Sequence, residues 1–395
     1  MIWLHRADRV TSRVRYLRLL LLGLCLTGCG DGFPTAFPLP TPAAIAPLGT
    51  RVMTVETIHE LEEIDSLSDK DAGTVAGLLF TPDLQTLLAV YTNEGRLRHW
   101  QLASGKVTKL FDVQPVGLGA VAFDATGMML ATGGGADWED HLNNDHYVGW
   151  RVWDVNTGDV IKGTNYEVFE RLGHRQFIPD IVLRPDGRYV TMISASPDLE
   201  LRSLKSFFTV GVTISQTGDL FVNFSRAPEE DDFDVIALDT RGEFLVAADE
   251  MGKVAIYPYE PPKYPEKPRA VVEKAGVRGA RPLALAFDAS RHWLARVRGT
   301  EIIVWDLQKW NYQRQLEGSV GDLSGISASL AFDPSGTLLG VGTANGWQIW
   351  NVDKGKLLLE QTGVEVYAVT FSPDGRLFAW GDGSGVVHIW GIPDK

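Results

Sequence analysis

Apolar and polar positions alternate in short runs along most of this chain, and Gly, Pro, Asn and Asp separate the runs. In the clearest copies an apolar residue precedes an Asp with Pro or Gly, then an apolar run, a second turn, and a run that ends on Trp. These copies span residues 78–100, 285–305, 330–350 and 369–390. Alternation with a period of two, bounded by such residues, predicts short strands joined by hairpins.

Weaker copies of the same pattern occur at 121–153, 181–204 and 236–257. The apolar residues that open successive copies are 39 to 60 residues apart, and self-similarity near 40–45 residues is typical of propeller blades. The pattern therefore predicts an all-β fold over residues 53–395: a single seven-bladed β-propeller of four-stranded antiparallel blades. Residues 205–235 fit either a long outer hairpin of the third blade or an extra irregular blade.

A tryptophan ends the third run in five of the copies. A large ring at one repeated place is expected to fill the space between neighbouring sheets, and we favour this structural role over an aromatic cage for a ligand. The five structural tryptophans are Trp100, Trp153, Trp305, Trp350 and Trp390.

The segments "IIVWDLQ" (302–308) and "WRVWDVNTG" (150–158) make this region resemble the WD-repeat β-propeller family. The resemblance implies a role in binding other proteins. It also implies a buried hydrogen-bond network of His, Asp, Ser or Thr, and Trp. Only one Gly-His pair, Gly173-His174, precedes a blade, so we expect this network to be largely missing.

The chain closes on "VVHIW", which as a strand would leave an apolar edge open to pairing with another chain. In closed propellers of the family that it resembles, the last blade takes its outer strand from the beginning of the chain. The segment "VETIHELEEIDSL" (55–67) has suitable length and apolar content. We expect residues 56–64 to pair beside Val387–Trp390 and close the ring.

Residues 1–28 read as a targeting segment. They carry a net charge of +4, and an apolar run at 19–29 follows the arginines. The run ends in Leu26-Thr27-Gly28-Cys29, which resembles the bacterial lipobox, in which the cysteine is lipidated and becomes the mature N-terminus. We therefore expect a lipoprotein signal peptide at 1–28, lipid attachment at Cys29, and a secreted protein on the extracytoplasmic side of a bacterial membrane.

Residues 29–52 contain five prolines, so they are expected to form an extended tether. Cys25 would leave with the signal peptide, which excludes a disulfide in the mature chain. Inner and outer membrane stay open, although Gly30 after the cysteine favours the outer membrane by analogy.

The formal net charge is −13, and −17 without the first 28 residues, which argues against nucleic acid as a partner. We expect a monomer that binds another protein, whose identity the sequence leaves open. Insertions longer than a hairpin needs are often functional. Three of them, at 133–149, 165–180 and 225–234, should extend one rim of the propeller, whereas 260–269 should lie on the opposite face.

The loop at 133–149 mixes aromatic and charged residues, as contact surfaces do. Its alternative role is a solvated acidic rim that covers itself. A metal site is not expected, because a calcium or zinc site needs ligands at defined positions. The candidate partner-binding residues are Trp138, Glu139, His141, Asp145 and Tyr147.

We find no HExxH, GxSxG or GxxxxGK[ST] motif, so the sequence predicts no catalytic residue and no cofactor. The hypothesis is a lipid-anchored, extracytoplasmic WD-repeat propeller that serves as a protein-binding scaffold. The alternative is a propeller that binds or processes a small ligand at its central channel.

Overall fold

The computed structural model describes most of residues 50–394. The internal segments left out are 69–72, 93–94, 114–117, 136–147, 164–176, 188, 196–204, 212–221, 226–232, 240, 250–253, 259–268, 273–281, 289–292, 299–300, 310–311 and 317–328. No helix among the described residues is long and apolar enough to cross a membrane.

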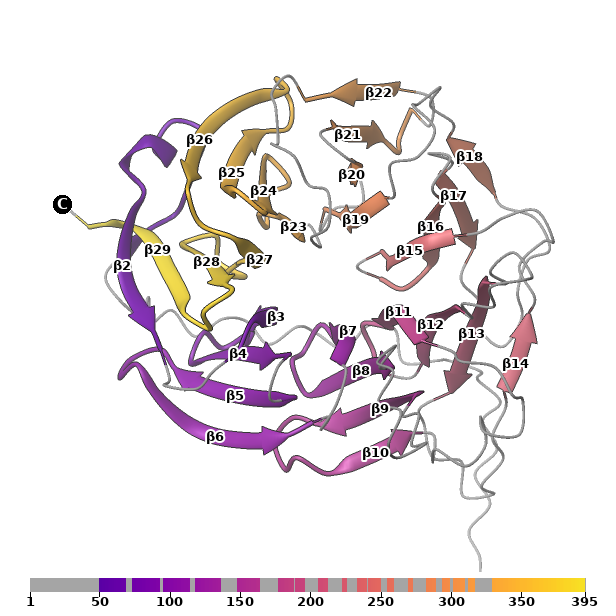
Figure 1. Cartoon of the computed structure of the whole chain (residues 1–395). Helices are drawn as coiled ribbons and strands as arrows, with labels where there is room; N and C mark the ends of the chain where they lie inside the picture. The colour runs from indigo at the N-terminus through magenta and orange to yellow at the C-terminus, as the bar shows by residue number, and fades with distance from the viewer. Residues whose placement is uncertain are drawn as a thin grey trace, which may run out of the picture. The chain divides into compact units, whose positions relative to one another are not determined.

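The described residues form six four-stranded antiparallel sheets, here called blades 1 to 6, and one five-stranded sheet, here called the terminal sheet. Figure 1 shows them side by side in a ring, with the first strand of each blade toward the centre. The strands of blades 1 to 3 are β3 (Val75–Phe80), β4 (Thr86–Tyr91), β5 (Arg96–Gln101) and β6 (Lys106–Asp112); β7 (Leu118–Phe123), β8 (Met129–Gly135), β9 (Val148–Asp154) and β10 (Val160–Gly163); and β11 (Phe177–Leu183), β12 (Tyr189–Ala195), β13 (Lys205–Gly211) and β14 (Val222–Ser225).

The remaining sheets complete the ring. The strands of blades 4 to 6 are β15 (Phe233–Leu238), β16 (Phe244–Asp249), β17 (Val254–Pro258) and β18 (Ala270–Val272); β19 (Pro282–Phe287), β20 (Trp293–Arg298), β21 (Glu301–Asp306) and β22 (Tyr312–Gln315); and β23 (Ser329–Phe332), β24 (Leu338–Thr343), β25 (Gly346–Asn351) and β26 (Lys356–Thr362). The terminal sheet contains β27 (Val366–Phe371), β28 (Leu377–Asp382) and β29 (Val387–Pro393), with β1 (Thr50–Arg51) and β2 (Glu62–Leu67).

The antiparallel four-stranded blades agree with the sequence prediction, but their number does not. Six sheets are four-stranded, one fewer than predicted, and the terminal sheet has five strands because β1 and β2 both pair with β29. The described residues 205–211 and 222–225 are the two outer strands of blade 3 and belong to no additional sheet. The third strand of blade 3 therefore lies at 205–211, later than the copy at 181–204 predicted.

The beginning of the chain does pair with β29, at a different place from the one expected. The paired strand is Glu62–Leu67, which runs beside Val387 to Gly391, whereas residues 58–60 form the 3-10 helix η1 (Ile58–Glu60). The cause is local. Thr54 and Thr57 bond each other through backbone and side chain, and Ile58 N–H donates to the Thr54 carbonyl, so this stretch turns.

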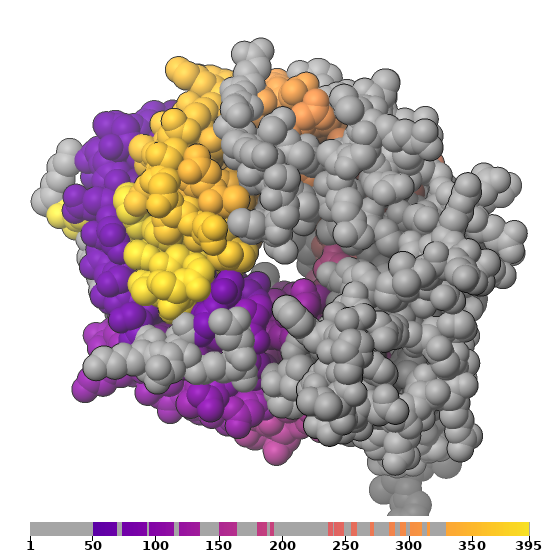
Figure 2. All heavy atoms as spheres, in the orientation of Figure 1, coloured from indigo at the N-terminus to yellow at the C-terminus, as the bar shows by residue number. Residues whose placement is uncertain are grey.

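Apolar clusters fill the spaces between neighbouring sheets. The innermost strands contact one another in chain order from β3 to β27, and β27 contacts β3. At the terminal sheet, Ile58 and Leu61 join a cluster with Trp347, Phe378 and other buried residues of blade 6 and the terminal sheet. Figure 2 shows the N-terminal segment and the C-terminal strands side by side on the surface.

The turns between first and second strands share one capping device. In six of the seven sheets the side chain of the residue after the opening apolar position accepts a backbone N–H across the turn, and Arg184 of blade 3 is the exception. Asp333 accepts from Leu338 N–H at 2.6 Å, and Ser372 Oγ accepts from Leu377 N–H at 2.9 Å. Gly375 takes a φ of 69°, which only glycine adopts readily. The sequence attributed this cap to the Asp of "SPDG". In the structure Asp374 adds one bond to Arg376 N–H, and Ser372 is the main acceptor.

Candidate functional site

The strand order gives the ring two different faces. Turns between first and second strands and between third and fourth strands lie on one face, here called the hairpin face. Turns between second and third strands, and connections to the next sheet, lie on the other, here called the connection face. The strands that flank residues 136–147, 164–176 and 317–328 end on the connection face. The segments 212–221 and 259–268 follow third strands, so they start from the hairpin face.

The candidate partner-binding residues Trp138, Glu139, His141, Asp145 and Tyr147 all fall within 136–147 and lie outside the described residues. Cys29 lies outside them as well. The flanking strands β8 and β9 are described, and they place both ends of this segment on the connection face of blade 2.

The structural tryptophans lie at the junctions between sheets. Four of them, Trp100, Trp153, Trp305 and Trp350, are at most 5% exposed, and Trp390 is half-buried. Each belongs to the cluster that joins its own sheet to the preceding one; Trp100, for example, packs with Leu377 and Ile389 of the terminal sheet. Nothing in this placement offers these rings to a ligand.

The indole N–H groups show which part of the implied polar network exists among the described residues. Trp153 Nε1 donates to Thr132 Oγ1 at 3.0 Å, Trp100 to the Tyr91 hydroxyl at 3.2 Å, and Trp350 to Gln348 Oε1 at 3.2 Å. Trp305 and Trp390 place Nε1 in buried positions without an acceptor. The acceptors differ from blade to blade. The sheet junctions are therefore held together mainly by packing of side chains and not by a repeated hydrogen-bond network.

A polar cluster at the connection face of the terminal sheet joins β2 and β29. The His388 ring stacks on Trp380 with centroids 3.8 Å apart, and its Nδ1 lies 2.6 Å from Glu63 Oε1 on β2. Its Nε2 lies 3.6 Å from an Asp382 oxygen. Asp382 also accepts the N–H groups of Ser384 and Val386, which shapes the turn before β29.

Next to this cluster, Tyr367 offers an aromatic ring and a phenol on the same face. Its hydroxyl donates to Glu365 Oε2 at 2.9 Å, and this bond raises the pKa of Tyr367 above its ordinary value. A Cβ on Gly383 would lie 3.1 Å from the Tyr367 ring, so a side chain there would press on it. Sequence reasoning missed this site because its residues come from four separate strands, β2, β27, β28 and β29, and a connection.

A second group of polar contacts links innermost strands through the wall of the ring. Asp180 on β11 accepts the Ile236 N–H of β15 at 2.8 Å, and Ser329 on β23 accepts the Val369 N–H of β27 at 3.0 Å. Both acceptors stand three residues before the strand's last apolar residue, so they occupy the same position in their blades. Burial raises the pKa of the Asp180 carboxyl from 3.8 to about 7, although the bonds from Ile236 and Ile181 N–H lower it.

A buried histidine lies at the junction of blades 1 and 2. His99 packs edge-on against Phe111, and burial, with Lys109 nearby, lowers its pKa to about 4. The ring is therefore neutral at neutral pH and part of the core. No group of His, Cys, Asp and Glu side chains in the described part of the chain is arranged to hold a metal ion.

Comparison with known proteins agrees with this architecture. Residues 355–391 match the family model described as "WD domain, G-beta repeat". The matched stretch runs from the outermost strand of blade 6 through the three C-terminal strands of the terminal sheet. No curated protein sequence matches the chain.

A solved structure extends the likeness over most of the chain. The crystal structure of the Myceliophteria thermophila Cps50 (Swd1) β-propeller domain matches with a TM-score of 0.62 and 15% sequence identity, covering 84% of this chain and 99% of that one. The chain is an all-β propeller that carries a WD repeat. At this identity the likeness supports the fold alone.

Proposed function

We propose that this propeller is a protein-binding scaffold, held on the extracytoplasmic side of a bacterial membrane by lipid on Cys29. The observation that carries the binding role is the asymmetry of the ring. The three longest connections, at 136–147, 164–176 and 317–328, all depart from the connection face, whereas the longest on the hairpin face, at 212–221 and 259–268, are shorter. Long loops on a rigid frame are a common basis for recognition.

The described part of the connection face supports the same role. Tyr367 presents an aromatic ring on this face beside Glu365, and aromatic residues are enriched at protein contact surfaces. The acidic net charge of −17 beyond residue 28 favours a partner with a basic surface and disfavours nucleic acid.

The binding role is tested by affinity capture from solubilised membranes with three full-length forms. One is unchanged, one has residues 136–147 replaced by a short Gly-Ser turn, and the third has residues 259–268 replaced by the same turn. We expect a partner that the unchanged chain and the 259–268 variant retain and the 136–147 variant loses. Retention by all three would contradict the proposed site, and loss by the 259–268 variant alone would move it to the hairpin face.

The anchor is tested by fractionation of the Cys29→Ser variant. We expect the unchanged chain to stay with membranes after a high-salt wash and to carry a mass increase at the mature N-terminal cysteine. The variant should lose that mass increase and the membrane association. Unmodified Cys29 in the unchanged protein would refute the lipid anchor while leaving the binding role testable.

A further inference from the structure

The first described residues are fixed to the hairpin face of the terminal sheet. Thr50 and Arg51 pair with Pro393 and Ile392 at the end of β29. Met53 N–H donates to the Gly375 carbonyl at 2.8 Å, and the Arg376 guanidinium donates to the Thr50 carbonyl. The turn from Ser372 to Leu377, which joins the first and second strands of the sheet, thereby holds the chain where it joins the propeller.

Arg51 fixes the same point from the other side. Its Nε donates to the Pro393 carbonyl at 3.2 Å, and its Nη2 forms an ion pair with Glu60 at 2.7 Å. Thr50 itself is fully buried. If only the end of a strand held the point where the tether is attached, that point could rotate freely. Here two guanidinium groups and a short strand fix Thr50 and Arg51 at the hairpin face.

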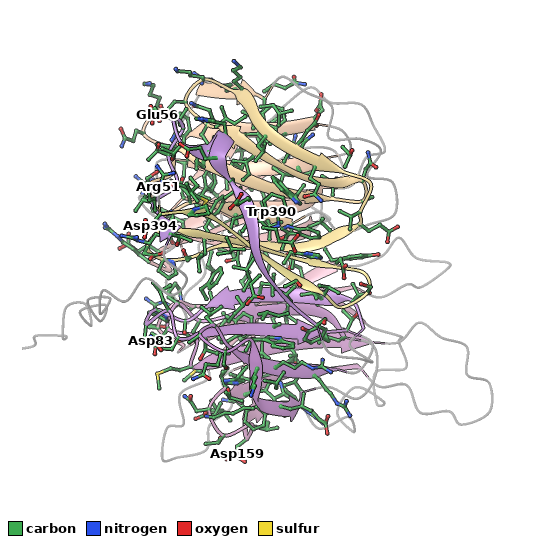
Figure 3. The ribbon with its side chains drawn as sticks, turned by 90° about the vertical axis from the view of Figure 1, so that its left-hand side faces the viewer. Arg51, Glu56, Asp83, Asp159, Trp390 and Asp394 are labelled. Carbon is green, nitrogen blue, oxygen red and sulfur yellow. The ribbon has the colours of Figure 1, made fainter. Side chains whose placement is uncertain are left out.

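The described ends of the chain lie on one face of the ring. Asp83 belongs to the first turn of blade 1 on the hairpin face, and Figure 3 shows Arg51, Glu56, Asp83 and Asp394 along the same side of the ring. The connection face, with the long connections and the Tyr367 and His388 contacts, lies across the thickness of the strands.

Turns on the hairpin face also pack against each other, which leaves them little freedom. A Cβ on Gly336 would lie 2.8 Å from an Asp288 oxygen of blade 5, and one on Gly242 would lie 2.7 Å from Arg184 of blade 3. The contacts between these turns hold neighbouring sheets of the ring together.

We propose that the hairpin face is the membrane-facing side of the anchored propeller, so that a partner meets the connection face from the side away from the lipid surface. This inference rests on the proposed anchor at Cys29. Twenty residues separate Gly30 from Thr50, and at roughly 3.1 Å per residue a proline-rich tether reaches about 60 Å. The connection face lies farther from the point of attachment than the hairpin face does, by the length of a six-residue strand, about 20 Å.

The test measures energy transfer from single dyes on the full-length, lipid-modified protein to an acceptor lipid in vesicles. Two exposed turn residues of blade 6 form a matched pair: Asp353 on the hairpin face and Asn345 on the connection face. Ala125→Cys, in the first turn of blade 2, adds a second hairpin-face position far along the chain. We expect greater transfer from dyes placed by Asp353→Cys and Ala125→Cys than from Asn345→Cys, because the connection face lies about 20 Å of strand farther from the point of attachment.

Equal transfer from the three positions, or greater transfer from Asn345→Cys, would overturn the orientation while vesicle recovery still supports the anchor. Failure of the unchanged chain to sediment with vesicles would overturn both proposals. In a final variant, a 40-residue Gly-Ser insertion after Leu39 should bring the three transfer values together. An undiminished difference would show that the tether's point of attachment does not set the orientation.

Discussion

The junction of blades 3 and 4 and the junction of blade 6 with the terminal sheet use the same backbone bridge with different chemistry. At the first, the Asp180 carboxylate accepts the Ile236 N–H; at the second, the Ser329 hydroxyl accepts the Val369 N–H. The surroundings differ as well. Among the described residues, the blade 3–4 cluster contains one aromatic ring, that of Tyr257, whereas the blade 6 junction gathers five large rings and is extended by the N-terminal segment.

The comparison shows that one repeated position can accept the same backbone N–H with a neutral or with an ionisable side chain. A neutral hydroxyl provides a bridge whose strength is independent of pH. A partly buried carboxyl provides the same bond but adds a charge whose removal from water is costly. The junction of blade 6 with the terminal sheet, here called the aromatic junction, contains both described ends of the chain. Its stability rests on the burial of its rings and on the pairing of β1 and β2 with β29.

The largest effect should come from removing the N-terminal part of the aromatic junction. Deletion of residues 53–64 takes away Met53, Ile58 and Leu61, all buried, together with part of β2. Each such side chain contributes about 1.5–3 kcal/mol by burial. We expect aggregation, or a sharply lower melting temperature by circular dichroism.

Ile58→Ala alone serves as the milder control for this deletion, with an expected cost of about 2–5 kcal/mol. An unchanged melting temperature in the deletion variant would show that the β29 edge needs no cover from the beginning of the chain.

Next in size, Trp347→Ala should destabilise the aromatic junction by about 3–5 kcal/mol in chemical denaturation. The ring is 1% exposed and makes edge contacts with Phe378 and Trp390, at 5.4 and 5.1 Å between centroids. Leu245→Ala is the comparison at the blade 3–4 junction, where the described cluster contains one aromatic ring, that of Tyr257. A smaller loss for Trp347→Ala than for Leu245→Ala would contradict the ranking of the two junctions.

Asp180→Ser tests the charged bridge directly. Because the pKa of Asp180 is raised from 3.8 to about 7, the folded state holds its proton more tightly than the unfolded state does. The free energy of unfolding should therefore fall as pH rises from about 4 to about 7 and level off above that. In Asp180→Ser this slope should diminish, while the side-chain bond to Ile236 is kept.

Ser329→Asp is the reciprocal change, since it places a carboxyl at the equivalent position of blade 6. We expect it to introduce a new fall in stability with rising pH, measured by denaturant unfolding at several pH values. An identical pH profile for the unchanged chain and Asp180→Ser would show that this carboxyl does not titrate differently in the two states.

Much of this architecture could be predicted from the sequence, because hairpin chemistry and strand alternation are local. The repeats indicated the positions of the sheets, and the Trp that ends the third run in five copies marked sheet junctions. Residues 58–60 were placed in a strand because their apolar content suits one, yet bonds between Thr54 and Thr57 turn the chain there.

Asp180 was predicted to end the long insertion at 165–180. The structure instead places it within β11, beside a register shift in the pairing with β12 that accommodates the preceding proline on an edge strand. Its bridge joins strands 56 residues apart, which local pattern cannot indicate. The His388 contacts could not be predicted for the same reason, since Glu63 and His388 are 325 residues apart.

The smallest effect should come from Ser329→Ala, which removes the neutral bridge alone. A hydrogen bond of this kind is worth about 0.5–1.5 kcal/mol, and the Val369 N–H would lose its acceptor. The expected loss is within that range at every pH, because no ionisable group is involved. Ser329→Thr keeps the hydroxyl and should restore most of the stability if the added methyl fits. A loss that varied with pH would mean that the bridge at blade 6 senses a neighbouring charge, and the contrast between the two junctions would then rest on packing alone.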